Sequence, residues 1–433
     1  MLFGKRITIC VLTGLFLVSA WLSYEYFKPL ARIKIKDKII RINPNVQIDP
    51  VKEYCLRVWD YDLPLKNCNY RQYMQKAVAD FQKIYPNIRV ELRFLDLLTG
   101  HGQLEAALEQ GDPPDLYCSA FSVPHFDLDY QIPVGPYLKT EELENAYPLS
   151  IQKLVQVDGV FSYFPRWLRW NLWVANRSLA EAAGFEVNKI QQQGWTWTQL
   201  FAAKDKYPAT VYSMVGNVIP MEVLRQILPN GCFVERQGES SWEWLQQLKE
   251  SQRLPEDFNS NMLDRFLSGQ VMFLAGISPI MLRVIRERLT QQGAAWEGVA
   301  LPVPELSKGR AIHSVEAGVI CVYRNRKRKG GSDHLAAAVK LGEYLSTYRD
   351  SSPWEELMVM PAARQVTLKW LQKQEPEQYP AVLEYMLNHN NLTIINIDES
   401  YREKTAALLL KYLTGKINRE ETIQQLKAEI YCD

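Results

Sequence analysis

The chain of 433 residues is longer than one ordinary hydrophobic core, and about 150 residues per domain predicts two or three domains. Its 47% hydrophobic and 23% charged residues are typical of a globular protein, whereas 12 Trp and 22 Tyr exceed what that composition requires. A formal net charge of +1 excludes an overall field that would recruit nucleic acid or an acidic membrane surface. Any partner must therefore be selected by local features of the surface.

The first 28 residues carry a targeting signature. Lys5 and Arg6 precede an almost unbroken apolar run from Ile7 to Leu22, whose length is intermediate between a signal-peptide core and a membrane span. Val18-Ser19-Ala20 satisfies a cleavage rule, but the aromatic residues that follow are typical of the interfacial belt of a membrane anchor. We predict an uncleaved anchor in residues 1–28, with a signal peptide cleaved near Ala20 as the alternative. The bulk of the chain would then lie outside the cytoplasmic membrane.

The next part of the chain alternates strand and helix patterns. Residues 29–54 are charged with isolated apolar positions and predict a linker or a short edge strand. The sequence "YCLRVWDYD" alternates apolar and polar residues, residues 70–85 place apolar side chains at i, i+3 and i+4, and residues 88–94 alternate again. A second helix pattern at 101–110 ends at Gly111 and two prolines, before the short buried strand 116–118. The order β-α-β-α-β predicts parallel strands with helices on both faces.

Two of these strands end in residues that suit a binding site. The carboxyl ends of parallel strands meet at one edge of the sheet, where ligands bind in open α/β folds. Trp59, Asp60 and Tyr61 end the first strand, and Ser119 and Phe121 follow the third. We predict that these five residues lie at the same edge; the alternative for Trp59 and Phe121 is that both are core aromatics.

Few motifs indicate an enzyme or a metal site. The seven cysteines are scattered without a CxxC pair, so a disulfide between Cys55 and Cys68 and buried free thiols are both open. No His-Glu-x-x-His, Gly-x-Ser-x-Gly or full Walker motif occurs, and we expect neither a cofactor nor a metal. A glycosidase stays open as an alternative because its two carboxylates need only meet in space. The basic run Arg324–Gly331 predicts a surface loop rather than a nucleic-acid site, with contact to lipid headgroups as a further alternative.

Ten short motifs occur together in one order. They are "VWDYD", "ADFQKIYPNIRVEL", "LEAALEQGDPPDLYCSAF", "VDGVFSYFP", "NRSLAEAAGF", "GWTWTQL", "FLSGQVMFLAG", "GVALPVP", "AAAVKLGEYLS" and "VMPAAR", and they cover roughly residues 55–365. In these motifs and their order the chain resembles family 1 of the extracellular solute-binding proteins, the maltose-binding-protein-like family that serves carbohydrate ABC transporters.

The resemblance implies a two-lobed periplasmic-binding-protein-like α/β fold whose lobes are joined by crossing segments that act as hinges. Lobe 1 would hold residues 55–169 and 298–349, and lobe 2 would hold residues 170–297 and 350–433. The crossings are expected near Arg169, Glu297 and Asp350. A ligand between the lobes would favour the closed arrangement, because closure adds contacts from lobe 2.

The same resemblance implies a sugar site in the cleft between the lobes. A sugar has hydroxyl groups around its rim and C–H groups on its faces, so polar groups and flat aromatic rings are needed together. Arginines can donate to hydroxyls or to an acidic group. We expect the ligand to contact residues at the strand ends, at the first crossing and at one further family position, namely Trp59, Asp60, Tyr61, Ser119, Phe121, Arg166, Trp167, Arg169, Trp170 and Arg364.

The implied function is that of a non-enzymatic extracytoplasmic protein that captures a small polar solute, foremost a sugar or oligosaccharide, and delivers it to the permease of an ABC importer.

Three departures from the family pattern concern the ligand and the anchor. Ile277-Ser278-Pro279 replaces a frequent cleft aromatic, Val174-Ala175-Asn176 replaces the usual Tyr-Asn, and the usual lipobox is missing. The alternatives are a membrane-anchored ligand sensor that feeds a signalling partner and, in a different class, a carbohydrate-active enzyme. Nucleic acid is not an expected partner.

Overall fold

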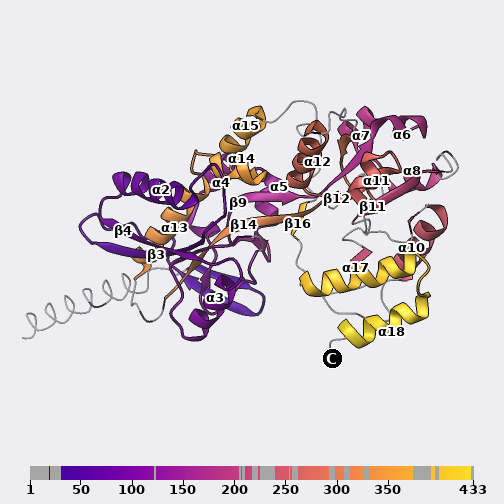
Figure 1. The fold of residues 1–433 in the computed structure, drawn as a ribbon. Coiled ribbons are helices and arrows are strands. Elements are labelled where there is room, and N and C mark those ends of the chain that lie inside the picture. Colours follow the sequence, from indigo (N-terminus) through magenta and orange to yellow (C-terminus); the bar gives the residue numbers. More distant parts are fainter. Residues whose placement is uncertain are drawn as a thin grey trace, which may run out of the picture.

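The computed structural model describes residues 19, 31–120, 123–203, 206, 210–216, 223–224, 239–252, 254–255, 262–291, 298–306, 313–325, 327, 331–373, 392–394 and 399–430. They form two α/β lobes, each built around its own sheet (Figure 1). The two-lobed α/β fold predicted from the sequence is confirmed. The anchor expected in residues 1–28 lies, except for Ser19, outside the described residues, and within the described ranges no helix is long and apolar enough to cross a membrane.

The sheet of lobe 1 contains the predicted parallel unit. Its strands lie in the order β15 (Met360–Pro361), β9 (Phe164–Trp170), β14 (His313–Tyr323), β5 (Leu116–Cys118), β3 (Tyr54–Tyr61) and β4 (Ile88–Leu95). Strand β3 is parallel to both β4 and β5, which confirms the β-α-β-α-β order, and β14 is antiparallel to β5 and β9. The short strands β6 (Gln131–Ile132) and β16 (Leu392–Ile394) also pair with β14.

The helices of lobe 1 cover both faces of this sheet. The helix predicted over 70–85 is α2 (Tyr70–Ile84), which begins where the Asn69 side chain accepts a hydrogen bond from the Gln72 N–H at 3.1 Å and which buries Tyr73, Ala77 and Phe81. The other helices are α3 (Gly100–Glu109), α4 (Thr140–Ala146), α5 (Leu149–Leu154), α13 (Ser332–Ser346), α14 (Ser352–Leu357) and α15 (Arg364–Lys373), with one 3₁₀ turn at Gly135–Tyr137.

Lobe 2 is built around a mixed four-stranded sheet. Its strands lie in the order β11 (Tyr212–Gly216), β12 (Val271–Ile277), β10 (Leu172–Asn176) and β13 (Gly298–Leu301). Three tryptophans of this lobe pack edge to face, with ring centroids 5.5 Å apart for Trp173 and Trp195 and 5.3 Å for Trp173 and Trp197. The helices are α6 (Arg177–Ala182), α7 (Val187–Gln193), α8 (Trp197–Ala202), α10 (Glu239–Ser251), α11 (Met262–Leu267), α12 (Pro279–Gln291), α17 (Glu399–Leu413) and α18 (Arg419–Ile430).

The strand pairing corrects two of the predicted lobe boundaries. Strand β13 pairs with β10, so residues 298–301 belong to lobe 2 and not to lobe 1. Strand β15 pairs with β9, and Trp354 and Trp370 lie in the core that includes the lobe 1 sheet, so residues 352–373 belong to lobe 1. The chain therefore crosses between β9 and β10, between β13 and β14, and between residues 394 and 399. The expected crossing at Asp350 is wrong, and Glu297 lies outside the described residues.

Residues 31–42 form a hairpin instead of the predicted linker. Strand β1 (Ala31–Ile35) is antiparallel to β2 (Lys38–Ile42), and their isoleucines at 35, 40 and 42 are buried in the lobe 1 core. A second hairpin is formed by β7 (Gln156–Val157) and β8 (Val160–Phe161), which are antiparallel and two residues long each. The linker prediction failed because alternating isoleucine and charged residues can bury one face of a hairpin as well as form an exposed edge strand.

Asp60 and Arg166 form an ion pair in the core of lobe 1. The Arg166 guanidinium lies 3.2 Å from the Asp60 carboxylate, which also accepts from the Tyr70 hydroxyl at 2.8 Å and the Tyr61 N–H at 2.8 Å. Burial lowers the pKa of Arg166, but Asp60 together with Tyr70, Cys118 and Tyr73 raises it by more, so the pKa stands well above its ordinary value. The pair joins β3 to β9, the strand that leads to the first crossing.

Cysteines at 68, 118 and 321 are free thiols, and the disulfide considered between Cys55 and Cys68 is not formed. Burial raises the pKa of the Cys118 and Cys321 thiols, so both are inert apolar side chains of the core at neutral pH. The remaining cysteines, at 10, 232 and 432, lie outside the described residues.

We expect Asp60→Asn to destabilise the protein strongly, because it leaves the Arg166 charge buried without its counter-ion. Removal of one partner of a buried pair costs about 3–5 kcal/mol. The matched variant Asp62→Asn breaks the exposed pair between Asp62 and Arg71, which should cost less than about 1 kcal/mol. Urea unfolding followed by circular dichroism measures both, and equal midpoints for the two variants would contradict this account of the pair.

Candidate functional site

Two neighbouring strands of lobe 1, β9 and β14, carry the chain toward and away from lobe 2. They are antiparallel, and Trp170 at the end of β9 pairs with Val315 near the start of β14. Side chains alternate between the two faces of a strand. Arg166 contacts Tyr70 of α2 and Trp170 contacts Trp370 of α15, so both point to the face that carries α2, α14 and α15 (Figure 1). Trp167 and Arg169 therefore point to the opposite face.

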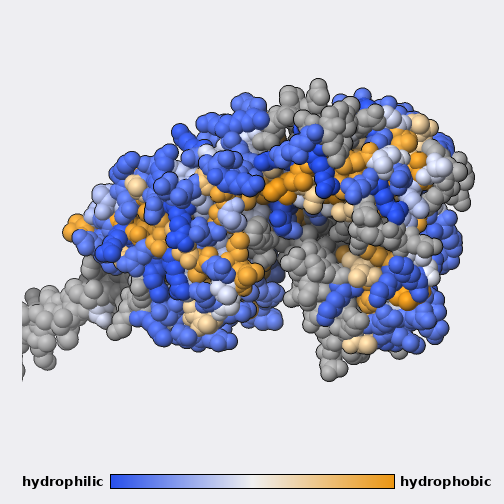
Figure 2. All heavy atoms as spheres, in the orientation of Figure 1, coloured by the Kyte–Doolittle hydropathy of each residue, from blue (hydrophilic) through white to orange (hydrophobic). Residues whose placement is uncertain are grey.

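This opposite face looks toward a hollow between the lobes. Figure 1 places α17 and α18 on this side of the crossing strands, and Figure 2 shows the surface hollowed between them and lobe 1. Arg169 on β9 and Glu316 on β14 are directly opposed in the strand register and form an ion pair. Their side chains are 33% and 22% exposed, so solvent reaches both. The crossing strands therefore place one donor group and one acceptor group on the side of the hollow.

Asp60 and Arg166, both predicted to contact ligand, contact each other instead. Each side chain is at most 3% exposed, and the carboxylate is fully used by protein donors. The structure thus leaves neither side chain exposed to a solute, because a residue at a strand end can point to either face of its sheet. Here the face of Asp60 is covered by α2.

The aromatic residues at the end of β3 are also engaged by the protein. The guanidinium of Arg93 on β4 lies 4.4 Å from the ring centroid of Trp59, which is 7% exposed. The hydroxyl of Tyr61 lies 2.6 Å from that of Tyr117. Burial raises the pKa of both tyrosines, so both are uncharged. Trp59 is thus the core aromatic that the alternative prediction described.

The other predicted residues are distributed between core and surface. Ser119 is buried, and its hydroxyl accepts from the Val319 N–H at 3.0 Å. Trp167 and Trp170 are only 1% and 2% exposed, so neither offers a ring face to a ligand. Arg364 is exposed at the start of α15 and donates to the Glu144 carbonyl of the α4 helix at 3.5 Å, on the face opposite the hollow. Phe121 lies outside the described residues.

Of the ten predicted residues, Arg169 is the one that the described structure leaves partly exposed beside the hollow. Sequence analysis missed its partner Glu316 and the half-buried Asn171, which lies between β9 and β10. The signal for Glu316 was a single acidic residue in the otherwise apolar stretch "SVEAGVICVY". Among the residues that the structure describes, no three His, Cys, Asp or Glu side chains are grouped as a metal site would require.

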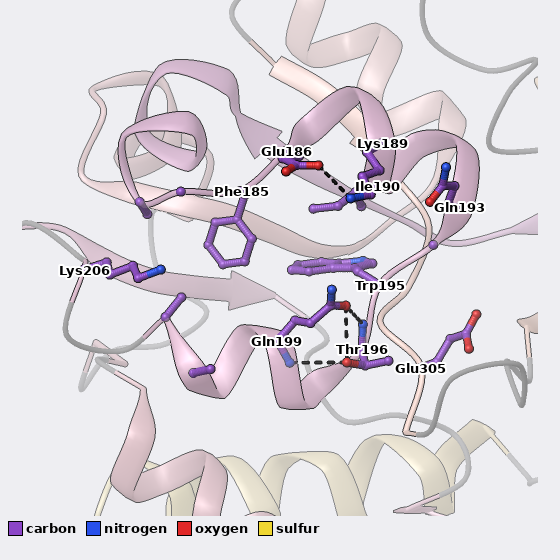
Figure 3. Close-up of a pocket in the computed structure, with 15 residues that line it drawn as sticks. Phe185, Glu186, Lys189, Ile190, Gln193, Trp195, Thr196, Gln199, Lys206 and Glu305 are labelled. Carbon is purple, nitrogen blue, oxygen red and sulfur yellow. Dashed lines mark hydrogen bonds and ion pairs between the residues drawn. The ribbon is translucent and has the colours of Figure 1, made fainter.

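A cavity of about 600 Å³ lies in lobe 2, between the α6–α7 connection, α7, α8 and the segment that follows β13 (Figure 3). Several of its polar side chains already have partners within the wall. Glu186 pairs with Lys189 at 3.0 Å, and Thr196 and Gln199 form a capping box at the start of α8. The Trp195 indole donates to the Pro302 carbonyl at 2.7 Å. The wall is therefore held by local structural bonds, and the site at the crossing strands is the stronger candidate.

Comparisons with known proteins agree with this architecture. Residues 69–220 match the family model of the bacterial extracellular solute-binding proteins, the family that the sequence motifs resemble. A search of curated protein sequences finds no match to this chain.

Solved structures share the fold over nearly the whole chain. The sugar-binding protein MalE from Xanthomonas citri is 18% identical, with a TM-score of 0.60 over 87% of this chain and 96% of that one. The family 1 extracellular solute-binding protein from Alicyclobacillus acidocaldarius is 13% identical, with a TM-score of 0.62 over 88% and 98%. The cyclic alpha-maltosyl-1,6-maltose binding protein from Arthrobacter globiformis is 14% identical, with a TM-score of 0.58 over 87% and 98%.

We expect Gly318→Ala to destabilise the crossing strands. A Cβ atom at Gly318 of β14 would lie 2.3 Å from the indole of Trp167 on β9, and such overpacking costs about 1–3 kcal/mol. Gly102→Ala in α3 is the control, because its Cβ meets no atom within 4 Å and alanine favours the helix by about 0.5–1 kcal/mol. Calorimetry should show a lower melting temperature for Gly318→Ala and an equal or higher one for Gly102→Ala. An unchanged melting temperature of Gly318→Ala would refute the close approach of Trp167 to position 318.

Proposed function

We propose that this protein captures a small polar solute, a sugar or an oligosaccharide, in the seam between its lobes. The observation that carries the proposal is the partly exposed Arg169–Glu316 pair beside the hollow, on the two strands that join the lobes. The family model and the two-lobed fold support solute capture. The names of the Xanthomonas citri and Arthrobacter globiformis proteins support a carbohydrate.

The chemistry of the pair suits a hydroxylated ligand. The Arg169 guanidinium presents several N–H donors in one plane, and the Glu316 carboxylate accepts from hydroxyl groups. Because each charge is opposed by the other, the pair adds no net charge to the site, which favours a neutral solute over an acidic one. Asn171, at the crossing, supplies an amide that can both donate and accept.

Our proposed site therefore differs from the one predicted from sequence. It keeps Arg169, adds Glu316 and Asn171, and assigns Trp59, Trp167 and Trp170 to the core. The aromatic rings that stack on the C–H faces of the sugar would have to come from other residues. Closure of lobe 2 over the solute would bring them into contact with it.

We further propose that the bound solute is passed to an ABC importer at the outer face of the cytoplasmic membrane. The family model supports an extracellular place of action. The sequence of residues 1–28, with two basic residues before an apolar run, supports export by an anchor or a signal peptide. No catalytic step is part of this proposal.

A thermal-shift screen across mono- and oligosaccharides, with neutral polyols and sugar acids as comparison, tests the proposed ligand class. A solute that binds only the folded protein at 100 times its dissociation constant stabilises it by about 2.7 kcal/mol, which raises the melting temperature. We expect neutral sugars to produce the shift and to remain chemically unchanged. A panel without any shift by a sugar, or turnover of a bound glycan, would contradict the proposal.

Glu316→Gln and Arg169→Gln test the proposed site. We expect each to weaken sugar binding at least about tenfold, since one donor or acceptor of a charged hydrogen bond contributes about 1.5–3 kcal/mol. Arg177→Gln, which breaks the exposed Arg177–Glu181 pair on α6, is the matched control and should bind normally. Isothermal titration calorimetry measures the affinities. If both site variants keep the affinity of the unaltered protein, the solute binds elsewhere.

A further inference from the structure

The hairpin of β1 and β2 carries an excess of positive charge. Residues 31–42 contain five basic side chains and one acidic side chain, although the whole chain is nearly neutral. The buried isoleucines fix one face of the hairpin against lobe 1, so the alternate positions must point outward. Arg32, Lys34, Ile39 and Arg41 are the exposed side chains of these positions, with Ile39 58% exposed.

The exposed basic side chains of the hairpin repel one another when no anion is bound. Arg32 lies directly opposite Arg41 in the strand register, and like charges in this position destabilise a hairpin. Within the described part of the chain, Arg32, Lys34 and Arg41 have no ion-pair partner. Two acidic groups near the hairpin are engaged by other residues of it: Asp129 pairs with Lys38, and Asp158 accepts from the Lys36 N–H. The acidic residue of the hairpin itself, Asp37, lies in the turn and not on the strands. An external anion would relieve this repulsion.

The basic run noted in the sequence lies beside the same hairpin. Arg324 follows β14 and donates through Nη2 to the Arg41 carbonyl at 2.8 Å. Lys327, three residues further, is exposed and also has no ion-pair partner among the described residues. We call Arg32, Lys34, Ile39 and Arg41 the basic face. Two segments that are 283 positions apart in the chain thus contribute positive charge to one surface of lobe 1.

We propose that the basic face binds an anionic phospholipid surface. Each lysine or arginine near such a surface contributes about 1 kcal/mol, and an exposed isoleucine among the charges can enter the headgroup layer. The apolar run that ends at Leu22 is separated from Ala31 by eight residues, which span at most about 30 Å. Wherever that run enters a membrane, the hairpin must therefore stay close to the headgroups.

The basic face suits lipid better than nucleic acid. It contains no aromatic side chain on which a base could stack, and it belongs to a two-stranded ribbon whose outer side combines charge with one aliphatic residue. Binding would leave the solute site free, because β14 begins at the crossing and reaches Arg324 only at its far end. Lobe 1 would rest on the membrane while lobe 2 moves.

Vesicle sedimentation of the full chain tests the proposal. Vesicles of phosphatidylcholine alone and of phosphatidylcholine with phosphatidylglycerol (about 7:3) are compared at low and high salt, since an apolar anchor contributes equally to both. We expect at least tenfold stronger partitioning into the anionic vesicles at low salt and loss of this preference at high salt, because screening weakens exposed charges. The triple variant Arg32→Gln, Lys34→Gln, Arg41→Gln should lose most of the preference and keep sugar binding.

A control with the same change of net charge separates the basic face from overall charge. Lys404, Lys411 and Lys416, changed to Gln together, remove three exposed charges from lobe 2 and should leave the lipid preference intact. If the triple hairpin variant has a lower melting temperature, the single variant Lys34→Gln replaces it. Lys34 lies opposite Ile39, and its loss should reduce the preference for anionic vesicles about fivefold. The proposal is overturned if the hairpin variants keep the preference, if the control loses it equally, or if a DNA duplex binds the unaltered chain more tightly than the anionic vesicles.

Discussion

The antiparallel pairing of β9 with β14 is the constraint on which the rest of the structure depends. This pair belongs to the lobe 1 sheet and also carries two of the three chain crossings. Every hydrogen bond that holds the two strands therefore also holds the connection between the lobes. The pairing leaves no room for a side chain at Gly318, where the Trp167 indole fills the space, and it sets Arg169 against Glu316. The same two strands therefore hold the sheet of lobe 1 together and lead into the hinge at its border.

The abundance of aromatic residues is explained mainly by the cores. In lobe 2, Trp173 packs edge to face against Trp195 and Trp197, and both Trp173 and Trp195 contact Phe273. In lobe 1, Trp170 packs against Trp370. Such contacts add about 0.5–1.5 kcal/mol each beyond burial. The described aromatics thus serve packing, whereas the candidate site is polar. A sugar-binding protein with buried tryptophans at its first crossing must draw its stacking surfaces from elsewhere.

Local patterns were sufficient to predict the elements of the first half of lobe 1. The spacing of Tyr73, Ala77 and Phe81 predicted α2, and the Gly-Asp-Pro-Pro-Asp turn predicted the entry into β5. Long-range pairing was not predictable, because β13 and β15 contain four and two residues and are defined only by their partners. The same limit applied to the site. Alternation along β9 divides its residues between two faces, but only the packing of α2 and α15 decides that Arg166 and Trp170 are covered and Arg169 is not.

Small-angle X-ray scattering tests the central claim, that a solute draws two hinged lobes together, most directly. Scattering curves are recorded for the protein alone and with a saturating amount of a sugar that raises its melting temperature. We expect a smaller radius of gyration with the sugar, because lobe 2 closes over the Arg169–Glu316 pair about the crossing strands. Identical curves in the two states would contradict it, since the solute would then bind without drawing the lobes together.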